Sequence, residues 1–302
     1  MKKGFKKKMA LSLGAITAAV ALFSGCGSSS SDDVIIYSNA DDEAVEAMKA
    51  ALDENGYEGK YILQTFGTSE LGGKLFAEGT DLEADLVTMS SFYLESSQQE
   101  NNMYADLTFD TGALEDYPAY YTPITSQEGA IIVNTEMMKE NNLPMPESLK
   151  DLADPVYDGF LSVTDIEGSS TAWLMIQALV DAYGEDGAKE ILRGIYKNAG
   201  DHLEESGSGP IKKVRAGEVA VGFGLRHQAV ADKKDGLPID FVDPAECIIK
   251  NGRPKLIKTY PNPLYQGETA DPENISAYPK TFPEKLTVDL LEQHKELSNE
   301  CK

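Results

Sequence analysis

Residues 34–66 read VIIYSNADDEAVEAMKAALDENGYEGKYILQTF, and the alternation within this stretch decides the fold class. The apolar run 34–37 predicts a buried strand. Residues 41–55 carry apolar side chains at helical spacing and acidic residues in the first turn, where carboxylates favour the positive end of the helix dipole. Residues 61–66 predict the next strand. Two strands joined by one helix predict a parallel βαβ unit and therefore an α/β domain.

The same alternation continues along the chain in two sets. A helix over 70–77 and a strand over 84–89 complete the first set. The second set comprises strands at 130–133, 160–163, 219–223 and 239–242 and helices at 171–183 and 185–197. Residues 117–128, rich in Pro, Tyr and Thr, predict a crossover between the sets. We therefore expect two α/β lobes with a ligand cleft at the carboxyl ends of the strands, and one larger doubly wound sheet is the alternative.

The predicted organisation has five parts. They are a signal peptide (1–25), a lipidated cysteine with a flexible tether (26–33), a first lobe (34–128), a second lobe (129–242), and a return segment with an atypical tail (243–302). The tail is rich in proline before residue 284, and its last part, 284–296, has a helical pattern. We expect the tail to pack on the first lobe.

The first 25 residues have the composition of an export signal. A basic start precedes an apolar run, 9–23, that is too short to cross a hydrocarbon core about 30 Å thick as a lone helix. Ser24 and Gly25 before Cys26 resemble a bacterial lipobox, in which the cysteine receives a lipid after cleavage. We expect an exported protein held by Cys26 at the outer face of a membrane, or a periplasmic one. An N-terminal anchor that is never cleaved is the alternative.

The charge balance excludes one class of partner. The chain has 27 basic and 50 acidic residues, a formal charge of −23, and removal of a leader with five lysines would make it more negative still. Nucleic acid requires a basic surface, so it is not an expected partner. Strong like charge also opposes self-association, so we expect a monomer.

The sequence contains few residues or motifs that are typical of catalytic or metal-binding sites. Apart from Cys26 only Cys247 and Cys301 are cysteines, and whether these two pair stays open. The three histidines lack zinc-site spacing, and nucleophile elbows, dinucleotide-binding turns and P-loops are missing from the sequence. We therefore expect a binding protein without a cofactor or a resident metal. An extracellular hydrolase of phosphorylated or acidic material is the alternative from another class.

Small hydroxyl residues cluster where expected strands end and helices begin. Such positions offer free backbone N–H groups, hydroxyl donors and the positive end of a helix dipole to an anion. Ordinary helix capping is the alternative for each cluster, but four clusters on one side of βα units predict an anion-binding cleft. The candidate ligand-binding residues in these clusters are Thr68, Ser69, Ser90, Ser169, Ser170, Thr171 and Ser208.

Two charged residues complete the candidate site. Arg226 follows the strand 219–223 and would make a bidentate contact to an oxyanion, unless it is a surface residue of the next helix. Glu128, in the crossover, would meet an ammonium group, unless it belongs to a solvated acidic face. Tyrosines at 37, 93, 120 and 121 would line the cleft or bind ferric iron, with core or rim packing as the alternative.

Seven stretches in order carry a family resemblance. They are TSEL at 68–71, ADLV at 84–87, GAIIVN at 129–134, LKDLADPVYDG at 149–159, GSSTA at 168–172, SGSGP at 206–210 and AGEVAVG at 216–222. From residue 34 to 246 the chain resembles solute-binding proteins of bacterial ABC importers, in the group that includes ferric-iron and 2-aminoethylphosphonate binders. The resemblance implies a two-lobed type II periplasmic-binding-protein-like fold that closes on a small ligand and delivers it to a permease and its ATPase.

The resemblance also assigns roles to residues. Positions 169–171 and Ser208 match anion-holding positions of related proteins, and Thr68 and Ser69 match the contribution of the first lobe. Ferric binders carry a neighbouring tyrosine pair after the strand that follows Gly217-Glu218, whereas this chain has Leu225 and Arg226 there. We therefore expect an organophosphonate such as 2-aminoethylphosphonate as the ligand, with ferric iron as the alternative.

Overall fold

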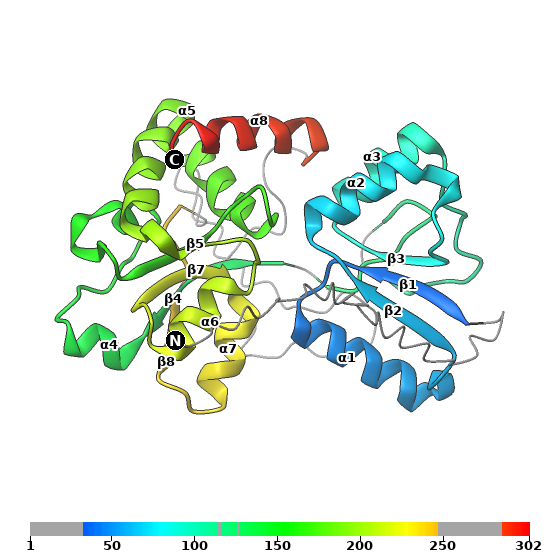
Figure 1. Ribbon diagram of the computed structural model, residues 1–302, viewed down its shortest axis with the longest axis horizontal. Coiled ribbons are helices and arrows are strands. Elements are labelled where there is room, and N and C mark those ends of the chain that lie inside the picture. Colours follow the sequence, from blue (N-terminus) through cyan, green and yellow to red (C-terminus); the bar gives the residue numbers. More distant parts are fainter. Residues whose placement is uncertain (1–32, 114–115, 126, 247–285) are drawn as a thin grey trace, which may run out of the picture.

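The computed structural model describes residues 33–113, 116–125, 127–246 and 286–302. They form two α/β lobes that lie side by side (Figure 1). Each lobe has its own sheet, so the prediction of two lobes is confirmed and the alternative of one larger sheet is wrong. The leader, Cys26 and Cys247 lie outside the described residues. Among the described helices, none has the length and apolar character needed to cross a bilayer.

The first lobe contains three parallel strands in the order β2-β1-β3. These strands are β1 (Val34–Ser38), β2 (Tyr61–Thr65) and β3 (Leu86–Thr88). Its helices are α1 (Asp42–Leu52), α2 (Thr68–Glu78) and α3 (Ser91–Asn101), with α1 on one face of the sheet and α2 and α3 on the other (Figure 1). A π-helical turn, Asp53–Tyr57, extends α1, and Gly56 there adopts φ 83°, a value that glycine accepts most readily.

The second lobe contains a mixed sheet in the order β6-β5-β7-β4-β8. Its strands are β4 (Gly129–Asn134), β5 (Leu161–Thr164), β6 (Leu203–Glu204), β7 (Val221–Leu225) and β8 (Ile239–Val242). Strand β4, which enters from the first lobe, runs antiparallel to β7 and β8, whereas β5 runs parallel to β6 and β7. The helices are α4 (Thr135–Glu140), α5 (Thr171–Ala199), α6 (Gly209–Ala216) and α7 (Arg226–Lys234). Short 3₁₀ turns lie at Gly79–Asp81, Lys150–Ala153, Pro155–Tyr157 and Gly200–His202.

Most helices follow the sequence pattern, with two instructive differences. The two helices expected at 171–183 and 185–197 are both part of α5, and Gly184 breaks the helical geometry between them with φ 71° and ψ 171°. Helix α3 has no counterpart in the sequence analysis. Its buried residues Phe92, Tyr93 and Leu94 are adjacent rather than spaced by three or four, so the helical period is weak there.

The last helix, α8 (Val288–Asn299), is the described part of the tail beyond residue 285, and it contacts both lobes. It lies along α5 of the second lobe and reaches α3 of the first lobe with a smaller part of its surface. The Trp173 Nε1 atom donates to His294 Nδ1 at 2.6 Å, and the hydroxyls of Tyr196 and Ser298 are 2.7 Å apart. The reason is that α5 offers an apolar surface, which the buried residue Leu291 and its helical neighbours cover.

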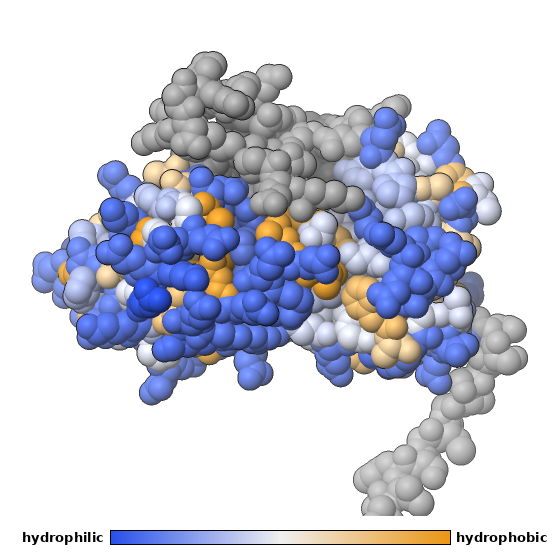
Figure 2. Space-filling view, turned by 90° about the horizontal axis from the view of Figure 1, so that it is seen from above, coloured by the Kyte–Doolittle hydropathy of each residue, from blue (hydrophilic) through white to orange (hydrophobic). Residues whose placement is uncertain are grey.

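The surface agrees with the acidic composition. Seen from above, hydrophilic residues cover most of the visible face, and hydrophobic residues are confined to small patches (Figure 2). The largest apolar cluster is interior and gathers around α5, β5 and β7.

Candidate functional site

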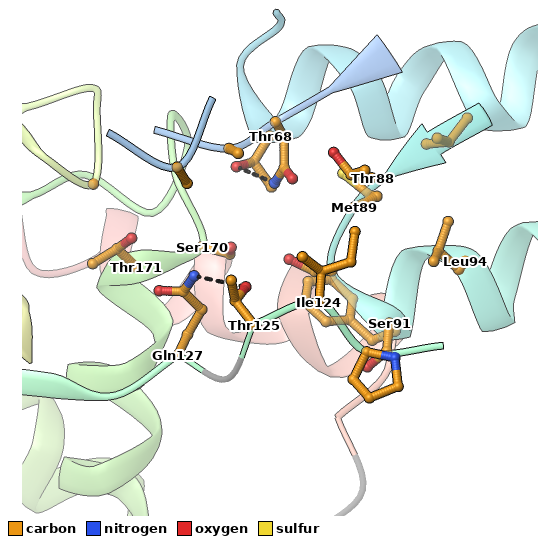
Figure 3. Close-up of a pocket in the computed structure, with 18 of the residues that line it drawn as sticks. Thr68, Thr88, Met89, Ser91, Leu94, Ile124, Thr125, Gln127, Ser170 and Thr171 are labelled. Atoms are coloured by element: carbon orange, nitrogen blue, oxygen red, sulfur yellow. Dashed lines mark hydrogen bonds between the residues drawn. The ribbon is translucent and has the colours of Figure 1, made fainter. Parts of the chain in front are cut away.

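A cavity of ≈ 2290 Å³ lies between the two lobes and is lined by residues of both. Figure 3 shows polar side chains around it that come from three parts of the chain. Thr68 comes from α2 of the first lobe, Ser170 from the start of α5 in the second, and Gln127 from the segment that joins the lobes. The cavity is the interlobe cleft that the sequence analysis expects.

Six of the described helices, α1, α2, α3, α5, α6 and α7, begin at this cleft, because the N-cap residue of each lines the cavity. Three of these N-cap residues, Ser90, Ser170 and Ser208, carry hydroxyls that make no capping hydrogen bond. By contrast, Asp41 at the cleft and the N-cap residues of α4 and α8 outside it each accept from the backbone of their own helix. The hydroxyls of Ser90, Ser170 and Ser208 therefore do not act as caps of the helices that they begin.

On the second lobe, hydroxyls and a glycine form a close group. The Thr171 backbone N–H donates to Ser169 Oγ at 3.3 Å, and the two hydroxyl oxygens are 3.4 Å apart. A methyl group placed on Gly207 would collide with Thr171 Oγ1 and crowd Ser169 Oγ. Ser208, almost fully buried, accepts from Gln228 Nε2 at 3.1 Å. The loop before α6 thus lies directly against the loop before α5, because glycine permits the approach.

On the first lobe, Thr68 and Ser69 have different surroundings. Thr68 is buried, lines the cavity and accepts from Asn39 Nδ2 at 3.1 Å. Ser69 is not one of the lining residues, and its hydroxyl donates to the backbone oxygen of Glu167 in the second lobe at 2.6 Å. Ser69 therefore contacts the opposite lobe, while Thr68 faces the cavity.

Glu128 lines the cleft as expected, but Arg226 does not. Arg226 is buried, its Nε atom donates to Asp243 Oδ1 at 2.9 Å, and its guanidinium lies 4.7 Å from the centre of the Phe241 ring. Its backbone N–H donates to the Glu128 backbone oxygen at 2.8 Å. Arg226 therefore connects the segments that join the lobes. Its side chain is not among the residues that line the cavity with the hydroxyl groups.

The tyrosines divide into packing residues and cleft residues. Tyr37 packs against Phe66 with ring centres 4.8 Å apart, and Tyr93 lies buried against Phe92. Tyr120 and Tyr121 line the cavity, and the Tyr121 hydroxyl donates to Glu95 Oε1 at 2.9 Å. Burial and this hydrogen bond raise the pKa of Tyr121, so its phenol stays protonated at neutral pH.

Acidic side chains outnumber basic ones around the cavity. Lys212 is the one basic residue among the described residues that line it, and its Nζ atom lies 2.9 Å from Asp42 Oδ2. Sequence reasoning missed Lys212, because its position on α6 carries no signal about the other lobe. The lining carboxylates are Asp41, Asp42, Glu70, Asp85, Glu95, Asp106, Glu128, Asp181, Glu205 and Glu246.

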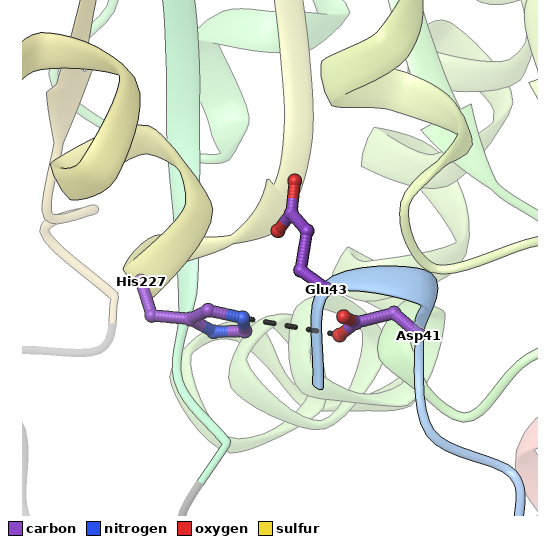
Figure 4. A group of neighbouring side chains, drawn as sticks. All are labelled: Asp41, Glu43 and His227. Carbon is purple, nitrogen blue, oxygen red and sulfur yellow. Dashed lines mark ion pairs between the residues drawn. The ribbon is translucent and has the colours of Figure 1, made fainter. Parts of the chain in front are cut away.

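Asp41, Glu43 and His227 lie together where α1 meets α7 (Figure 4). Their potential ligand atoms lie within 4.8 Å of one another, and His227 Nε2 is 3.8 Å from Asp41 Oδ2. The two Glu43 oxygens, however, accept from Arg215 Nη2 and Gln228 Nε2, each at 2.9 Å. A metal ion would have to displace those donors, so the group acts as part of an ion-pair seam between the lobes rather than as a metal centre.

A family model described as bacterial extracellular solute-binding protein matches residues 86–272. An uncharacterised protein of Haemophilus influenzae is 30% identical over 115 residues, which are 38% of this chain and 33% of that protein, so the chain spans about a third of that relative.

Several solved structures share the fold. The periplasmic binding protein AfuA from Actinobacillus pleuropneumoniae, with exogenous fructose-6-phosphate bound, has a TM-score of 0.57 and 24% identity over 72% of this chain and 70% of its own. The periplasmic binding protein P5PA has a TM-score of 0.62 and 18% identity, and the match covers 89% of this chain and 98% of that protein. Iron-bound HitA from Pseudomonas aeruginosa has a TM-score of 0.61 and 19% identity, and the match covers 89% of this chain and 99% of that protein.

Proposed function

Because this chain belongs to the family of bacterial extracellular solute-binding proteins, we propose that its cleft captures an organophosphonate such as 2-aminoethylphosphonate. The family implies delivery of the ligand to an ABC permease and its ATPase rather than catalysis. The ligand itself is inferred from the chemistry of the cleft.

The observation that carries the proposal is the meeting of uncapped helix N-termini at one cavity. Thr68 is the first residue of α2 in the first lobe, and Ser170 and Ser208 are the N-cap residues of α5 and α6 in the second. Hydroxyl groups and positive dipole ends together suit the oxygens of a phosphonate. Donors within hydrogen-bond distance outweigh the acidic surface, whose field is screened over about 8 Å at physiological salt.

The carboxylates around the cavity favour a zwitterion over a ligand with negative charge alone. An anion without a cationic group would meet many acidic side chains and one lysine, Lys212, that is already paired with Asp42. A ligand with an ammonium group gains from the same carboxylates. We propose Glu128, half-buried at the joining segment, as the partner of that ammonium group.

Capture would proceed by closure of the lobes. Contacts such as Ser69 to Glu167 and Lys212 to Asp42 join the lobes in this structure. A ligand that receives donors from both lobes binds the closed arrangement better than the open one and therefore shifts the population toward it.

Calorimetric titration and thermal unfolding with a panel of ligands test the proposal. The panel contains 2-aminoethylphosphonate, methylphosphonate, inorganic phosphate, fructose 6-phosphate and ferric citrate. A ligand at 100 times its Kd adds about 2.7 kcal/mol to the free energy of unfolding. Binding of 2-aminoethylphosphonate at least tenfold tighter than of methylphosphonate supports the zwitterion. Absence of any phosphonate binding contradicts the proposal.

Substitutions locate the site. Ser170→Ala and Thr171→Ala should each weaken 2-aminoethylphosphonate binding by roughly 10-fold or more, because a lost hydrogen bond to a charged group is worth about 1.5–3 kcal/mol. Glu128→Gln should weaken 2-aminoethylphosphonate but not methylphosphonate. Ser96→Ala, on α3 and not among the lining residues, is the control.

Ferric iron is the second candidate, because oxygen ligands also line the cavity. Tyr120, Tyr121 and Glu95 lie together there, although the Tyr121 phenol is protonated and donates to Glu95. A coloured complex with ferric citrate, together with no phosphonate binding, would favour iron.

We also propose attachment to a membrane through lipid on Cys26. In an expressing cell, Cys26→Ala should move the protein from the membrane fraction to the soluble exported fraction. Equal membrane association of both forms would contradict this anchor.

A further inference from the structure

We propose that α8 positions the turn formed by residues 165–170, through Asn299 and Lys302, and so sets the geometry of the anion-binding hydroxyls. The inference rests on the proposed function, in which Ser169 and Ser170 of this turn hold the ligand. It gives a role to the tail, whose sequence pattern points to no function.

The turn is organised around Asp165. The backbone N–H groups of Gly168 and Ser169 donate to the Asp165 backbone oxygen at 3.2 and 3.0 Å. The Glu167 N–H donates to Asp165 Oδ1 at 3.0 Å. A movement of Asp165 therefore changes the path of the chain that leads into Ser170.

Asn299, the last residue of α8, and Lys302, three positions after it, hold the two acidic residues of the turn. Lys302 Nζ lies 2.7 Å from each carboxylate oxygen of Asp165, and Asn299 Nδ2 donates to Glu167 Oε1 at 2.7 Å. Lys302 also donates to Asn299 Oδ1 at 2.9 Å, so the two anchors are linked. The side chains of Lys302 and Asp165 are 26% and 21% exposed, which places their ion pair above the weakest, fully exposed class.

Helix α8 is itself well supported, so it can act as an anchor. Besides the Trp173–His294 and Tyr196–Ser298 contacts, Lys189 Nζ of α5 lies 2.6 Å from Glu300 Oε2. Trp173 lines the ligand cavity, so α8 contacts the cleft elements at two points, the turn and this ring.

The same turn also contacts the first lobe. The Ser69 hydroxyl donates to the Glu167 backbone oxygen, and the side chain of Glu167 is held by Asn299. One short segment therefore carries the candidate anion donors, the closure contact and the α8 anchors. A displaced turn would impair binding and closure together.

Hydrogen exchange and calorimetry on the full chain test this role. Lys302→Met and Asn299→Ala should speed amide exchange at residues 165–170 at least threefold and weaken 2-aminoethylphosphonate binding by roughly 5- to 10-fold. This loss is smaller than the roughly 10-fold or more expected for a lost hydrogen bond to a charged group, because both residues act through the turn. Lys302→Arg keeps the charge and should restore both properties to near those of the unchanged protein.

Lys189→Met is the matched control, because it removes an ion pair of α8 that does not touch the turn. It should lower the melting temperature about as much as Lys302→Met and leave exchange at 165–170 and affinity unchanged. Equal effects of the two variants on the turn would overturn the inference, as would unchanged exchange in Lys302→Met. Faster exchange with unchanged affinity would also overturn it.

Failure of the proposed function is recognised separately. If the unchanged protein binds neither 2-aminoethylphosphonate nor inorganic phosphate, the assigned ligand is wrong. The exchange measurements need no ligand, so they then decide alone whether α8 positions the turn.

Discussion

The hydroxyl of Ser69 in the first lobe donates to the backbone carbonyl oxygen of Glu167 in the second lobe at 2.6 Å. The two residues are 98 positions apart in the chain. Their contact lies beside the cavity, next to the hydroxyls that begin α5. Closure of the lobes and the shape of the candidate anion site therefore depend on the same short turn.

The first prediction concerns this contact. Ser69→Ala should weaken ligand binding by about 2- to 10-fold, because the closed arrangement loses one hydrogen bond worth about 0.5–1.5 kcal/mol. The melting temperature of the unliganded protein should change little. Calorimetry measures the affinity, and Ser96→Ala is the control. Equal affinities of the Ser69→Ala variant and the unchanged protein would show that the contact does not contribute to closure.

The second prediction concerns Gly207, beside Thr171 and Ser169. Gly207→Ala should abolish anion binding, because the added methyl group collides with Thr171 Oγ1 and displaces the hydroxyl group. Gly73→Ala on α2 is the control, since a methyl group there meets open space. Far-ultraviolet circular dichroism checks that both variants fold. Unchanged affinity in a folded Gly207→Ala variant would place the ligand elsewhere in the cavity.

The third prediction concerns the ion-pair seam between α1 and the helices α6 and α7. Glu43→Gln should open the unliganded protein, because Glu43 accepts from Arg215 and Gln228 of the other lobe. The expected change is about 0.2–1 kcal/mol, since the ion-paired side chains of Glu43 and Arg215 are 47% and 25% exposed, and added salt should reduce it.

Small-angle scattering measures this opening as an increase in the radius of gyration. Glu46→Gln is the matched control, because Glu46 pairs with Lys49 within α1 and not across the lobes. If both variants scatter alike, the seam does not hold the lobes together.

The fourth prediction concerns Tyr121 and pH. Burial and the hydrogen bond to Glu95 raise its pKa above the ordinary value of 10.0. The neutral phenol is therefore favoured by folding. Its stabilising contribution is fully present below pH 10 and is lost as the pH rises past 10 toward the higher folded-state pKa.

An ultraviolet titration of tyrosinate, with Tyr121→Phe subtracted, should show a group that ionises above pH 10. At neutral pH neither protein should develop a visible iron–tyrosinate band with ferric citrate. A titration midpoint at or below 10, or a band that Tyr121→Phe removes, would revive the ferric alternative.

Much of the local structure follows from sequence alone for identifiable reasons. The unit β1-α1-β2 has strong strand and helix periods, and the break in α5 falls at Gly184, which lacks a side chain and accepts a positive φ. Helix α3 escapes prediction because Phe92, Tyr93 and Leu94 are consecutive, and tertiary contacts rather than a periodic stripe bury them.

The sequence pattern likewise predicts some residues of the candidate site and not others. Thr68, Ser170 and Ser208 each follow a strand, β2 in the first lobe and β5 and β6 in the second, and all three line the cleft. Their position after a strand is visible in the local pattern. Arg226 has the right local position but a different partner, Asp243, which long-range packing brings to it. Lys212 lies at the cleft only because the lobes meet there.

The sequence by itself determined the two-lobed α/β class, the family and the hydroxyl clusters, because strand and helix periods and short motifs are local properties of the chain. Only the tertiary structure decided that α8 lies along α5, that Ser69 bonds to Glu167, and that Lys302 holds Asp165. A local pattern states which kind of partner a side chain needs. Which partner it meets depends on packing between segments far apart in the chain.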